Sequence, residues 1–517
     1  MNTTSLLRSF RLTFLPPLMV YVAAGISGLT AIVGTFFVKD YLGLSAQFLA
    51  ALSFWAVLPW ALKMPVGHLV DLIWRWKESL VFLGALLLSS SILIMIGLLA
   101  DPQAMRAIMP AERWYVLAAI LSPVGYMLQD VVADAMTVEA VPRLGPDGLP
   151  IEVGELRAMH TTMQTLGRVA IVGGGILVAL VNVFFMAGVG ALPEKLKIAA
   201  YLNVYYCALA IPLVSVAGVL FAAWLRHRAP QKQPRVDHRP PVNWWILGGG
   251  LVFAGIAVTV GLSDLKYGQE VIFSASMTIV LFLMWRLLRE LEPDARSTLI
   301  GTATVIFVFR AMPGTGAGAS WWMIDVLKFD QQFLSQLSLV ASVVALIGLV
   351  LLRRFMAERS IYTIVALLTI IGSVMSLPQI GMFYGVHEWT AARTGGVVDA
   401  RFIALIDTAL ESPLGQIAMV PMLAWIANSA PEKLKATYFA VMASFTNLAL
   451  SASQLGTKYL NQMFVVSREV KDPVTRVVKV PADYSELGEL YITATLIGLC
   501  VPLVVILVMR SARLRGA

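Results

Sequence analysis

The sequence predicts an all-α polytopic membrane protein with about 14 transmembrane helices, arranged as two six-helix halves with a two-helix insert. Of its 517 residues, 58% are hydrophobic and only 14% are charged, whereas soluble domains carry about 25% charged residues. Apolar runs of about 20 residues, long enough to span a bilayer, recur along the whole chain with short polar breaks. The basic residues are concentrated in alternate loops, as in proteins that cross a membrane many times.

Six apolar segments make up the first half. The first of them follows Arg8 and Arg11, continues well past the length of a signal peptide and lacks a small-residue cleavage site, so we interpret it as a retained helix. The six segments lie near residues 12–38, 47–73, 79–100, 113–139, 160–189 and 198–225. They predict an N-terminal six-helix domain over residues 1–225.

A polar, basic stretch at 226–241 separates this half from two further apolar segments, 244–263 and 268–289, which have no charge near their middles. We interpret residues 226–296 as a cytoplasmic linker plus an inserted, lipid-facing hairpin. Six more segments lie near 297–323, 331–353, 360–384, 401–428, 434–462 and 488–510, within a C-terminal half over 297–517. Two inserted helices leave both halves in the same orientation, which is the plan of the major facilitator superfamily.

The net charge of +8 follows from membrane topology. If the N-terminus is cytoplasmic, most of the Lys and Arg residues fall in loops on the cytoplasmic side, as the positive-inside rule requires. The sequence therefore predicts a protein of the cytoplasmic membrane with both termini inside. It gives no indication of a nucleic-acid partner.

Two opposite charges in the first half lie at similar depths in the bilayer. A charge at the bilayer centre costs at least about 2.5–3.5 kcal/mol, so each is a functional candidate. At 1.5 Å per residue, Lys63 and Asp130 are both roughly 24 Å from the outer face. A Lys63–Asp130 pair is therefore allowed, either for function or for neutralisation alone.

The segment LQDVVADAMTVE (128–139) carries three carboxylates. Asp130 and Asp134 are one turn apart on one face, where mutual repulsion favours proton exchange, whereas Glu139 points the other way near the cytoplasmic end. A clamp that joins the inner ends of helices through Arg75, Lys77 or Arg143 is the interpretation that we favour for the last two acids. The predicted cytoplasmic gate consists of Asp71, Asp134, Glu139 and Arg75.

The second half repeats this pattern of embedded charges. Arg310 lies about 20 Å into its helix, and Asp407 and Glu411 share a face at a spacing of four residues. Arg168 is also near the middle of a predicted helix. Guanidinium groups hold carboxylates through paired hydrogen bonds, so these residues suit an anionic solute with a neutral polar edge.

Helix interruptions are expected in the second half. The segment AMPGTGAGA (311–319) and the prolines at 313, 378 and 421 weaken the helical hydrogen-bond ladder. This composition is typical of a gated transporter helix. Small residues also serve plain helix packing, and for the glycines that alternative stays open.

Enzymatic and metal motifs are not found in the sequence. It contains no Walker loop, no zinc-protease motif and no nucleophile elbow, and Cys207 and Cys500 lie in apolar segments without metal-ligand spacing. We therefore expect a protein that is not an enzyme and needs no cofactor or metal. Transport without a nucleotide-binding domain must draw on an ion gradient.

Several stretches together resemble the folate–biopterin transporter family of the major facilitator superfamily. KMPVGHLVD (63–71) resembles that family's Lys, Pro, Gly, Asp signature, and LQDVVADAMTVE is similar to its acidic helix 4 motif. More specific are the stretches at 309–348, with its proline and aromatic pair, and IDTALESPLGQIAMVPML (406–423). The segment at 430–447 is similar to the opening of the family's helix 11. The resemblance covers most of both halves but not the hairpin.

The resemblance implies uptake of folates or pterins with protons by alternating access. A folate offers a glutamate dianion for Arg310, Arg168 or Lys63, and a pterin edge that can donate to Asp130 or Asp407. Glu411 or Asp130 would carry the coupling proton. The implied partners are an anionic solute, protons and the lipid bilayer, with the protein acting as a monomer.

Two other functions stay open from the sequence. One is transport of another organic anion by a muropeptide-type permease. The other is a pigment-delivery or assembly factor that transports nothing, which the opposite charges within the membrane argue against.

Overall fold

The computed structural model describes residues 11–512 except 43, 142–150, 229–241, 262, 264, 290–291, 352–358, 430–434 and 472–477. The chain forms two compact units. Unit 1 is Met1–Val33 with Pro65–Trp244, and unit 2 is Gly34–Met64 with Trp245–Ala517. The division between the units falls inside the first two apolar segments. The domain boundaries expected at residues 225 and 296 therefore stay a prediction.

The described residues are largely helical, which confirms the all-α prediction. Eleven helices among them are long and apolar enough to cross a membrane. The expected segments near 297–323, 401–428 and 434–462 are also helical, but they are not among these eleven. The expected count of about 14 spans is therefore not confirmed. The protein is a multi-pass integral membrane protein.

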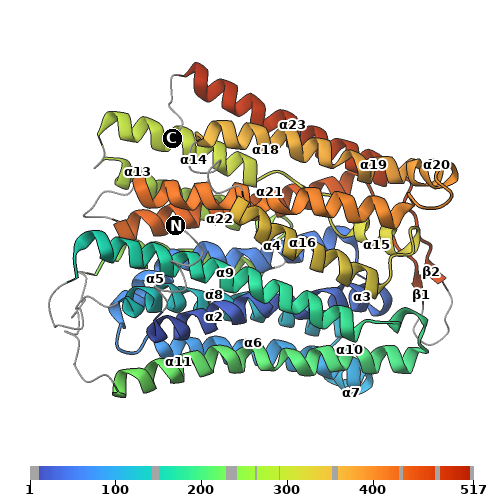
Figure 1. Ribbon diagram of the computed structural model, residues 1–517, viewed down its shortest axis with the longest axis horizontal. Helices are drawn as coiled ribbons and strands as arrows, with labels where there is room; N and C mark the ends of the chain where they lie inside the picture. Colours follow the sequence, from blue (N-terminus) through green and yellow to red (C-terminus); the bar gives the residue numbers. More distant parts are fainter. Residues whose placement is uncertain are drawn as a thin grey trace. The chain divides into compact units, whose positions relative to one another are not determined.

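Unit 1 holds most helices of the expected N-terminal half (Figure 1), whereas Gly34–Met64 of that half belong to unit 2. Three helices, α3 (Ala31–Tyr41), α5 (Lys63–Leu72) and α12 (Trp244–Gly261), carry residues of both units. The others are η1 (Leu12–Phe14), α2 (Leu15–Gly25), η2 (Ile26–Thr30), α6 (Glu78–Ala100), α7 (Pro102–Ile108), α8 (Ala111–Ala140), α9 (Val153–Phe185), η4 (Val189–Ala191), α10 (Glu194–Ala208) and α11 (Ala210–Arg228).

Glycines allow two helix pairs of unit 1 to approach backbone to backbone. A Cβ on Gly84 in α6 would lie 2.6 Å from the carbonyl oxygen of Gly125 in α8. A Cβ on Gly25 in α2 would lie 2.3 Å from the carbonyl oxygen of Ile171 in α9. Small residues of this kind let membrane helices pack closely. Here they bring α6 against α8 and α2 against α9, and the polar residues described below lie on α2, α8 and α9.

Unit 2 contains the inserted hairpin and the second series of helices. Figure 1 shows α18 and α23 side by side, as their contacts require. Its elements are α4 (Ala46–Val57), η3 (Leu58–Leu62), α12 (Trp244–Gly261), α13 (Gly268–Leu288), α14 (Pro293–Arg310), α15 (Ala317–Asp325), α16 (Gln331–Leu351), α18 (Ile361–Met375), α19 (Leu377–Phe383), α20 (Val386–Arg393), α21 (Ala400–Ser429), α22 (Lys435–Met463), β1 (Val470–Lys471), β2 (Val478–Val480) and α23 (Leu487–Ser511).

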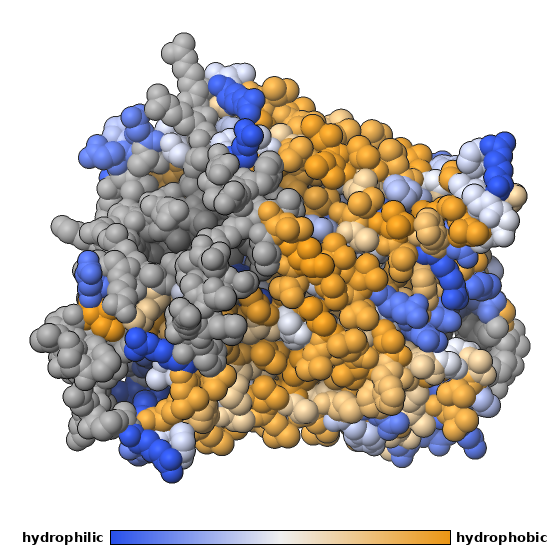
Figure 2. Space-filling model, in the orientation of Figure 1, coloured by the Kyte–Doolittle hydropathy of each residue, from blue (hydrophilic) through white to orange (hydrophobic). Residues whose placement is uncertain are grey.

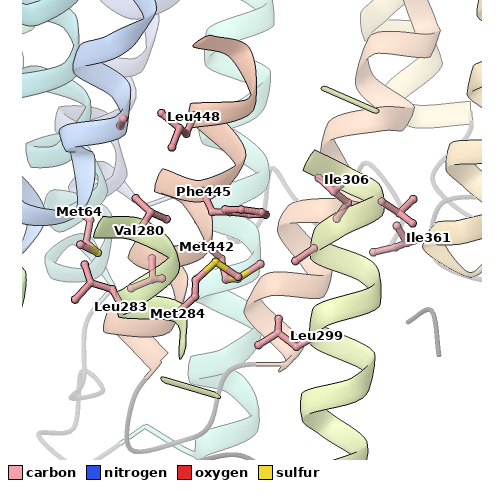
Figure 3. Packing of buried hydrophobic residues seen from close by; sticks show 14 of the residues in the cluster. Met64, Val280, Leu283, Met284, Leu299, Ile306, Ile361, Met442, Phe445 and Leu448 are labelled. Carbon is pink, nitrogen blue, oxygen red and sulfur yellow. The ribbon is translucent and has the colours of Figure 1, made fainter. Parts of the chain in front are cut away.

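The core of unit 2 is built around α22. Figure 3 shows Met442 and Phe445 of α22 between Met284 of α13 and Ile306 of α14. Phe445 also packs against Phe307, with the rings tilted and their centroids 4.7 Å apart. The second helix of the inserted hairpin is therefore part of this core.

The surface of unit 2 fits a bilayer. Figure 2 shows hydrophobic residues along the middle of α18 and α23 and hydrophilic residues toward both of their ends. Before α23, the short strands β1 and β2 pair antiparallel, and Ser467 and Asp483 exchange two backbone hydrogen bonds of 2.9 Å. This loop brings Tyr484 against the end of α15.

Candidate functional site

A partly buried hydrogen bond joins α2 to α8 in unit 1. The Tyr21 hydroxyl donates to Oδ1 of Asp134 at 2.6 Å, and the charges of Asp130 and Arg168 also act on this phenol. Tyr21, Asp130, Asp134 and Arg168 are called the Tyr21 cluster below. Three of the residues expected from the sequence are therefore gathered around a tyrosine that the sequence analysis did not select.

Glycine at position 167 makes room for this tyrosine. A Cβ there would lie 2.8 Å from Cε2 of Tyr21. Because Arg168 is the next residue of α9, the same close approach brings its backbone beside the tyrosine ring. A guanidinium, a phenol and two carboxylates are therefore gathered where α2, α8 and α9 pack together.

An ion pair lies where α8 ends in unit 1. Nζ of Lys77 is 2.6 Å from Oε1 of Glu139 and lies 4.1 Å from the centre of the Trp74 ring. Lys77 is only 3% exposed, although it belongs to a turn. Such a buried ammonium requires its carboxylate partner.

The residues of the predicted gate are distributed over different places in unit 1. Glu139 pairs with Lys77, whereas Arg75 is exposed and Asp134 belongs to the Tyr21 cluster. Asp71 acts electrostatically on His68, whose Nε2 accepts a hydrogen bond of 2.9 Å from the Asn243 backbone. The basic partner of Glu139 is thus Lys77, one of the three that the sequence left open.

The helix that carries Arg310 is interrupted, as the sequence predicts. Helix α14 ends at Arg310 and α15 begins at Ala317, with Pro313 between them. Helix α18 likewise ends just before Pro378, whereas α21 continues through position 421. Arg310 therefore lies at an open helix end, where the backbone can change direction.

Three polar side chains of α22 hold this interruption. Ser453 donates to the Met312 carbonyl at 2.7 Å, Thr457 accepts from the Gly314 N–H at 2.9 Å, and Asn461 donates to the Thr315 carbonyl at 3.3 Å. Their spacing of four residues places them on one face of α22. They satisfy backbone groups that would otherwise be costly to leave unbonded in a membrane.

Gly316 is required by the geometry of the same interruption. Its φ of +74° lies in the left-handed region, which residues with a Cβ rarely adopt. A Cβ there would also come within 2.8 Å of Nδ2 of Asn461.

The two acids of α21 have different environments. Asp407 is 5% exposed; Gln379 of α19 donates to its Oδ2 at 3.4 Å, and its Oδ1 has no hydrogen-bond partner among the described residues. Glu411 is exposed, and its charge acts on Asp407.

Lys63, the remaining expected residue, is half-buried at the first position of α5 in unit 2. Its pairing with Asp130 of unit 1 stays a prediction.

A polar contact that the sequence analysis did not select joins α3 to α15 in unit 2. Nζ of Lys39 is 2.5 Å from Oδ1 of Asp325, and the Tyr484 hydroxyl donates to Oδ2 of Asp325 at 2.5 Å. Burial and the Asp325 carboxylate raise the pKa of Tyr484 above its usual range. The phenol therefore donates this hydrogen bond at any physiological pH. These three residues are called the α15 latch below.

The inserted hairpin is tied to both α4 and α22. Gln269 donates to the Ala51 carbonyl at 3.0 Å, while Glu270 accepts from Nζ of Lys458 at 2.8 Å and from the Tyr459 hydroxyl at 2.5 Å. The hairpin is therefore joined to its neighbours in unit 2 by polar contacts. It braces two helices of unit 2 at one end.

We expect Glu270→Gln to lower the stability of the folded protein by about 1–2 kcal/mol, because the negative charge that pairs with Lys458 is lost while the shape of the side chain is kept. The change is checked by thermal unfolding in detergent. Glu388→Gln, at an exposed position of α20, is the matched control and should leave the midpoint unchanged. Equal midpoints for Glu270→Gln and the wild type would show that the brace contributes nothing.

Comparisons with known proteins agree on one family and one fold. The model of the BT1 family matches residues 24–515. The "Folate-biopterin transporter" of Synechocystis sp. is 23% identical over 435 residues, which cover 84% of this chain and 71% of that protein.

Solved structures of transporters have a similar fold. A POT family transporter in complex with 5-aminolevulinic acid is 11% identical with a TM-score of 0.61, and 96% of each chain is covered. A structure of proton dependent oligopeptide transporters is 17% identical with a TM-score of 0.59, covering 97% of this chain and 99% of the other. At these identities the likeness shows the fold alone, which this chain shares with these transporters.

Proposed function

The chain belongs to the BT1 family, and on that premise we propose that it is a secondary active transporter that moves folates or pterins together with protons. The observation that carries the proposal is the Tyr21 cluster. Charged residues inside a membrane helix cost at least about 2.5–3.5 kcal/mol each. The cost of placing two carboxylates and a guanidinium around one phenol is offset most readily where these groups bind a charged solute or a proton.

The proposed substrate is an anion with a flat, hydrogen-bonding ring. Arg310, Arg168 and Lys63 would bind its carboxylates, because guanidinium and ammonium groups form charge-assisted hydrogen bonds with them. Asp130 or Asp407 would accept hydrogen bonds from the amino group and ring N–H of a pterin. The free Oδ1 of Asp407 is consistent with such an acceptor.

Proton coupling needs a carboxylate that changes its protonation during the cycle. Asp134 is held as an acceptor by the Tyr21 hydroxyl, so its proposed role is to fix the cluster. Asp130, one turn away on the same face, and Glu411 are the proposed proton carriers. Repulsion between neighbouring carboxylates favours uptake of one proton when the substrate is absent.

Alternating access needs contacts that close each end of the protein in turn. With the N-terminus in the cytoplasm, as the distribution of basic residues indicates, α3 ends at the outer face and α8 ends at the inner face. The α15 latch would then close the outside, and the Lys77–Glu139 pair would help to close the inside, together with Asp71 and Arg75. The proposed setting is the cytoplasmic membrane, with the protein acting as a monomer.

Uptake of radiolabelled folic acid tests the proposal in cells that lack their own folate carrier. We expect accumulation that collapses with a protonophore. Arg310→Gln should lower uptake about 10- to 100-fold at matched expression, because a charge-assisted hydrogen bond contributes about 1.5–3 kcal/mol. Arg393→Gln, which removes an exposed guanidinium stacked on Trp389, is the control.

Each result that contradicts these expectations tests a different part of the proposal. Normal uptake by Arg310→Gln removes this residue from the site but leaves the transport proposal standing. If neither folic acid nor simple pterins accumulate although the protein reaches the membrane, the substrate proposal is wrong. Labelled muropeptides then test a transporter of another organic anion, and flux of neither class favours a protein that transports nothing.

A further inference from the structure

One end of the inserted hairpin carries a row of tilted aromatic rings with guanidinium groups over two of them, called the hairpin stack below. Trp245 of α12 lies beside Phe282 of α13, with ring centroids 5.7 Å apart, and Phe282 lies 6.1 Å from Trp285. The guanidinium carbon of Arg286 is 4.4 Å from the centre of the Trp245 ring, and that of Arg289 is 3.9 Å from the Trp285 ring. Both arginines and both tryptophans are exposed.

These two guanidinium groups are held by the rings alone. Among the described residues, neither Arg286 nor Arg289 forms a hydrogen bond or an ion pair with a carboxylate. The next arginine differs, because Nε of Arg296 donates to the Leu288 carbonyl at 3.0 Å. Stacking fixes the planes of Arg286 and Arg289 while their N–H groups stay available to an external anion.

The surface beside this stack is apolar. Leu251, Val252 and Leu281 are 74%, 56% and 47% exposed. A Cβ on Gly248 or Gly255 of α12 would meet no atom within 4 Å. The hairpin therefore presents a smooth hydrophobic face that ends at a pair of positive charges.

We propose that this end of the hairpin binds an anionic phospholipid, with the phosphate held by Arg286 and Arg289 and the acyl chains lying along α12 and α13. Paired N–H donors of arginine match phosphate oxygens. Tryptophan rings favour the depth of the lipid headgroups. The predicted topology places this end in the cytoplasmic leaflet, where anionic lipids attract basic residues. The proposal depends on membrane insertion and is independent of the transported solute.

Lipid retention by the purified full-length protein tests this proposal. The protein is mixed with equal amounts of phosphatidylglycerol and phosphatidylcholine in detergent, and the bound lipids are counted by native mass spectrometry. We expect the wild type to retain phosphatidylglycerol at least about tenfold better than phosphatidylcholine, a preference that a 1.4 kcal/mol difference would give. Arg286→Gln with Arg289→Gln should lose this preference.

Two further variants separate the proposed site from general charge effects. Arg393→Gln removes a guanidinium stacked on Trp389 at 4.1 Å in α20 and should retain the preference. Arg286→Lys with Arg289→Lys keeps both charges but not the planar N–H pairs, so it should retain an intermediate preference. Size-exclusion profiles and circular dichroism confirm that each variant is folded.

Three results of the retention experiment would overturn the proposal. They are equal retention of the two lipids by the wild type, an unchanged preference in the double Gln variant, and an equal loss in Arg393→Gln. Inorganic phosphate at millimolar concentration serves as a separate competitor and should not displace the lipid, because it lacks the acyl chains. Displacement by phosphate alone would identify a site for a free anion instead.

Discussion

Asp134→Asn should reduce substrate uptake by about 10- to 100-fold, because the substitution removes the charged acceptor of the Tyr21 hydroxyl. Hydrogen bonds to charged groups contribute about 1.5–3 kcal/mol, and the bond between Tyr21 and Asp134 is 2.6 Å long. Tyr21→Phe removes the donor and keeps the ring against Gly167. We expect it to have a similar effect, measured as initial uptake rate at matched expression.

A double-mutant cycle distinguishes a shared site from two independent defects. If Tyr21 and Asp134 act through their hydrogen bond, the double variant should be little worse than either single variant, since interacting residues are not additive. Tyr206→Phe, at an exposed position of α10, is the matched control and should transport normally. Fully additive losses would show that the bond plays no part in transport.

Asp130 should behave differently from Asp134 if it carries the proton. Asp130→Asn is neutral at all pH values, so it should abolish accumulation driven by the proton gradient while exchange of labelled for unlabelled substrate continues. Asp134→Asn should impair both processes, because it disturbs the cluster itself. Loss of exchange in Asp130→Asn would assign it to substrate binding rather than to coupling.

Hydropathy and charge are sufficient to predict the helical membrane fold, because each span must bury its own backbone polar groups in a helix. They also predict most of the Tyr21 cluster, since Asp130, Asp134 and Arg168 are costly in a bilayer wherever they point. Tyr21 gives no such signal. A tyrosine in an apolar helix is equally compatible with packing or with an interfacial position, and only the contact between α2 and α8 shows its partner.

Contacts between distant segments explain the other differences. Arg75 and Lys77 are two residues apart in a turn, and the sequence gives no reason to choose between them for Glu139. The interruption after Arg310 is visible from Pro313 and its glycines, but the side chains that hold it are on α22. The spacing of Ser453, Thr457 and Asn461 is a signal for a polar helix face, although its target is known only from the structure.

The α15 latch was missed for a physical reason as well. Lys39 and Asp325 each lie near the end of a predicted span, where a charged side chain can reach water and needs no special explanation. They are 286 positions apart in the sequence, and the 2.5 Å ion pair appears only when α3 and α15 are brought together. Its position at the ends of two helices suggests a contact that opens and closes.

Removing one charge of the latch should therefore slow transport, and restoring the pair in reverse should recover it. Lys39→Gln leaves Asp325 partly buried without its ammonium partner, so the closed outer end becomes less stable. We expect uptake to fall about 5- to 30-fold, the effect of about 1–2 kcal/mol. Asp325→Asn should have a similar effect, and Tyr484→Phe a smaller one because it removes a neutral donor.

The charge-reversed double variant, Lys39→Asp with Asp325→Lys, distinguishes an ion pair from two separate roles. It should transport better than either reversed single variant, because only the double variant restores the attraction between α3 and α15. Lys266→Gln, in the exposed turn of the inserted hairpin, controls for the loss of a positive charge elsewhere in unit 2. The raised pKa of Tyr484 means that its contribution is present below the usual tyrosine pKa of about 10 and is lost as the pH rises toward the higher folded value. The latch should thus lose no tyrosine hydrogen bond between pH 5 and 8, so the ratio of wild-type to Tyr484→Phe uptake should stay constant over that range. A ratio that changes with pH in that range would contradict this assignment of the donor.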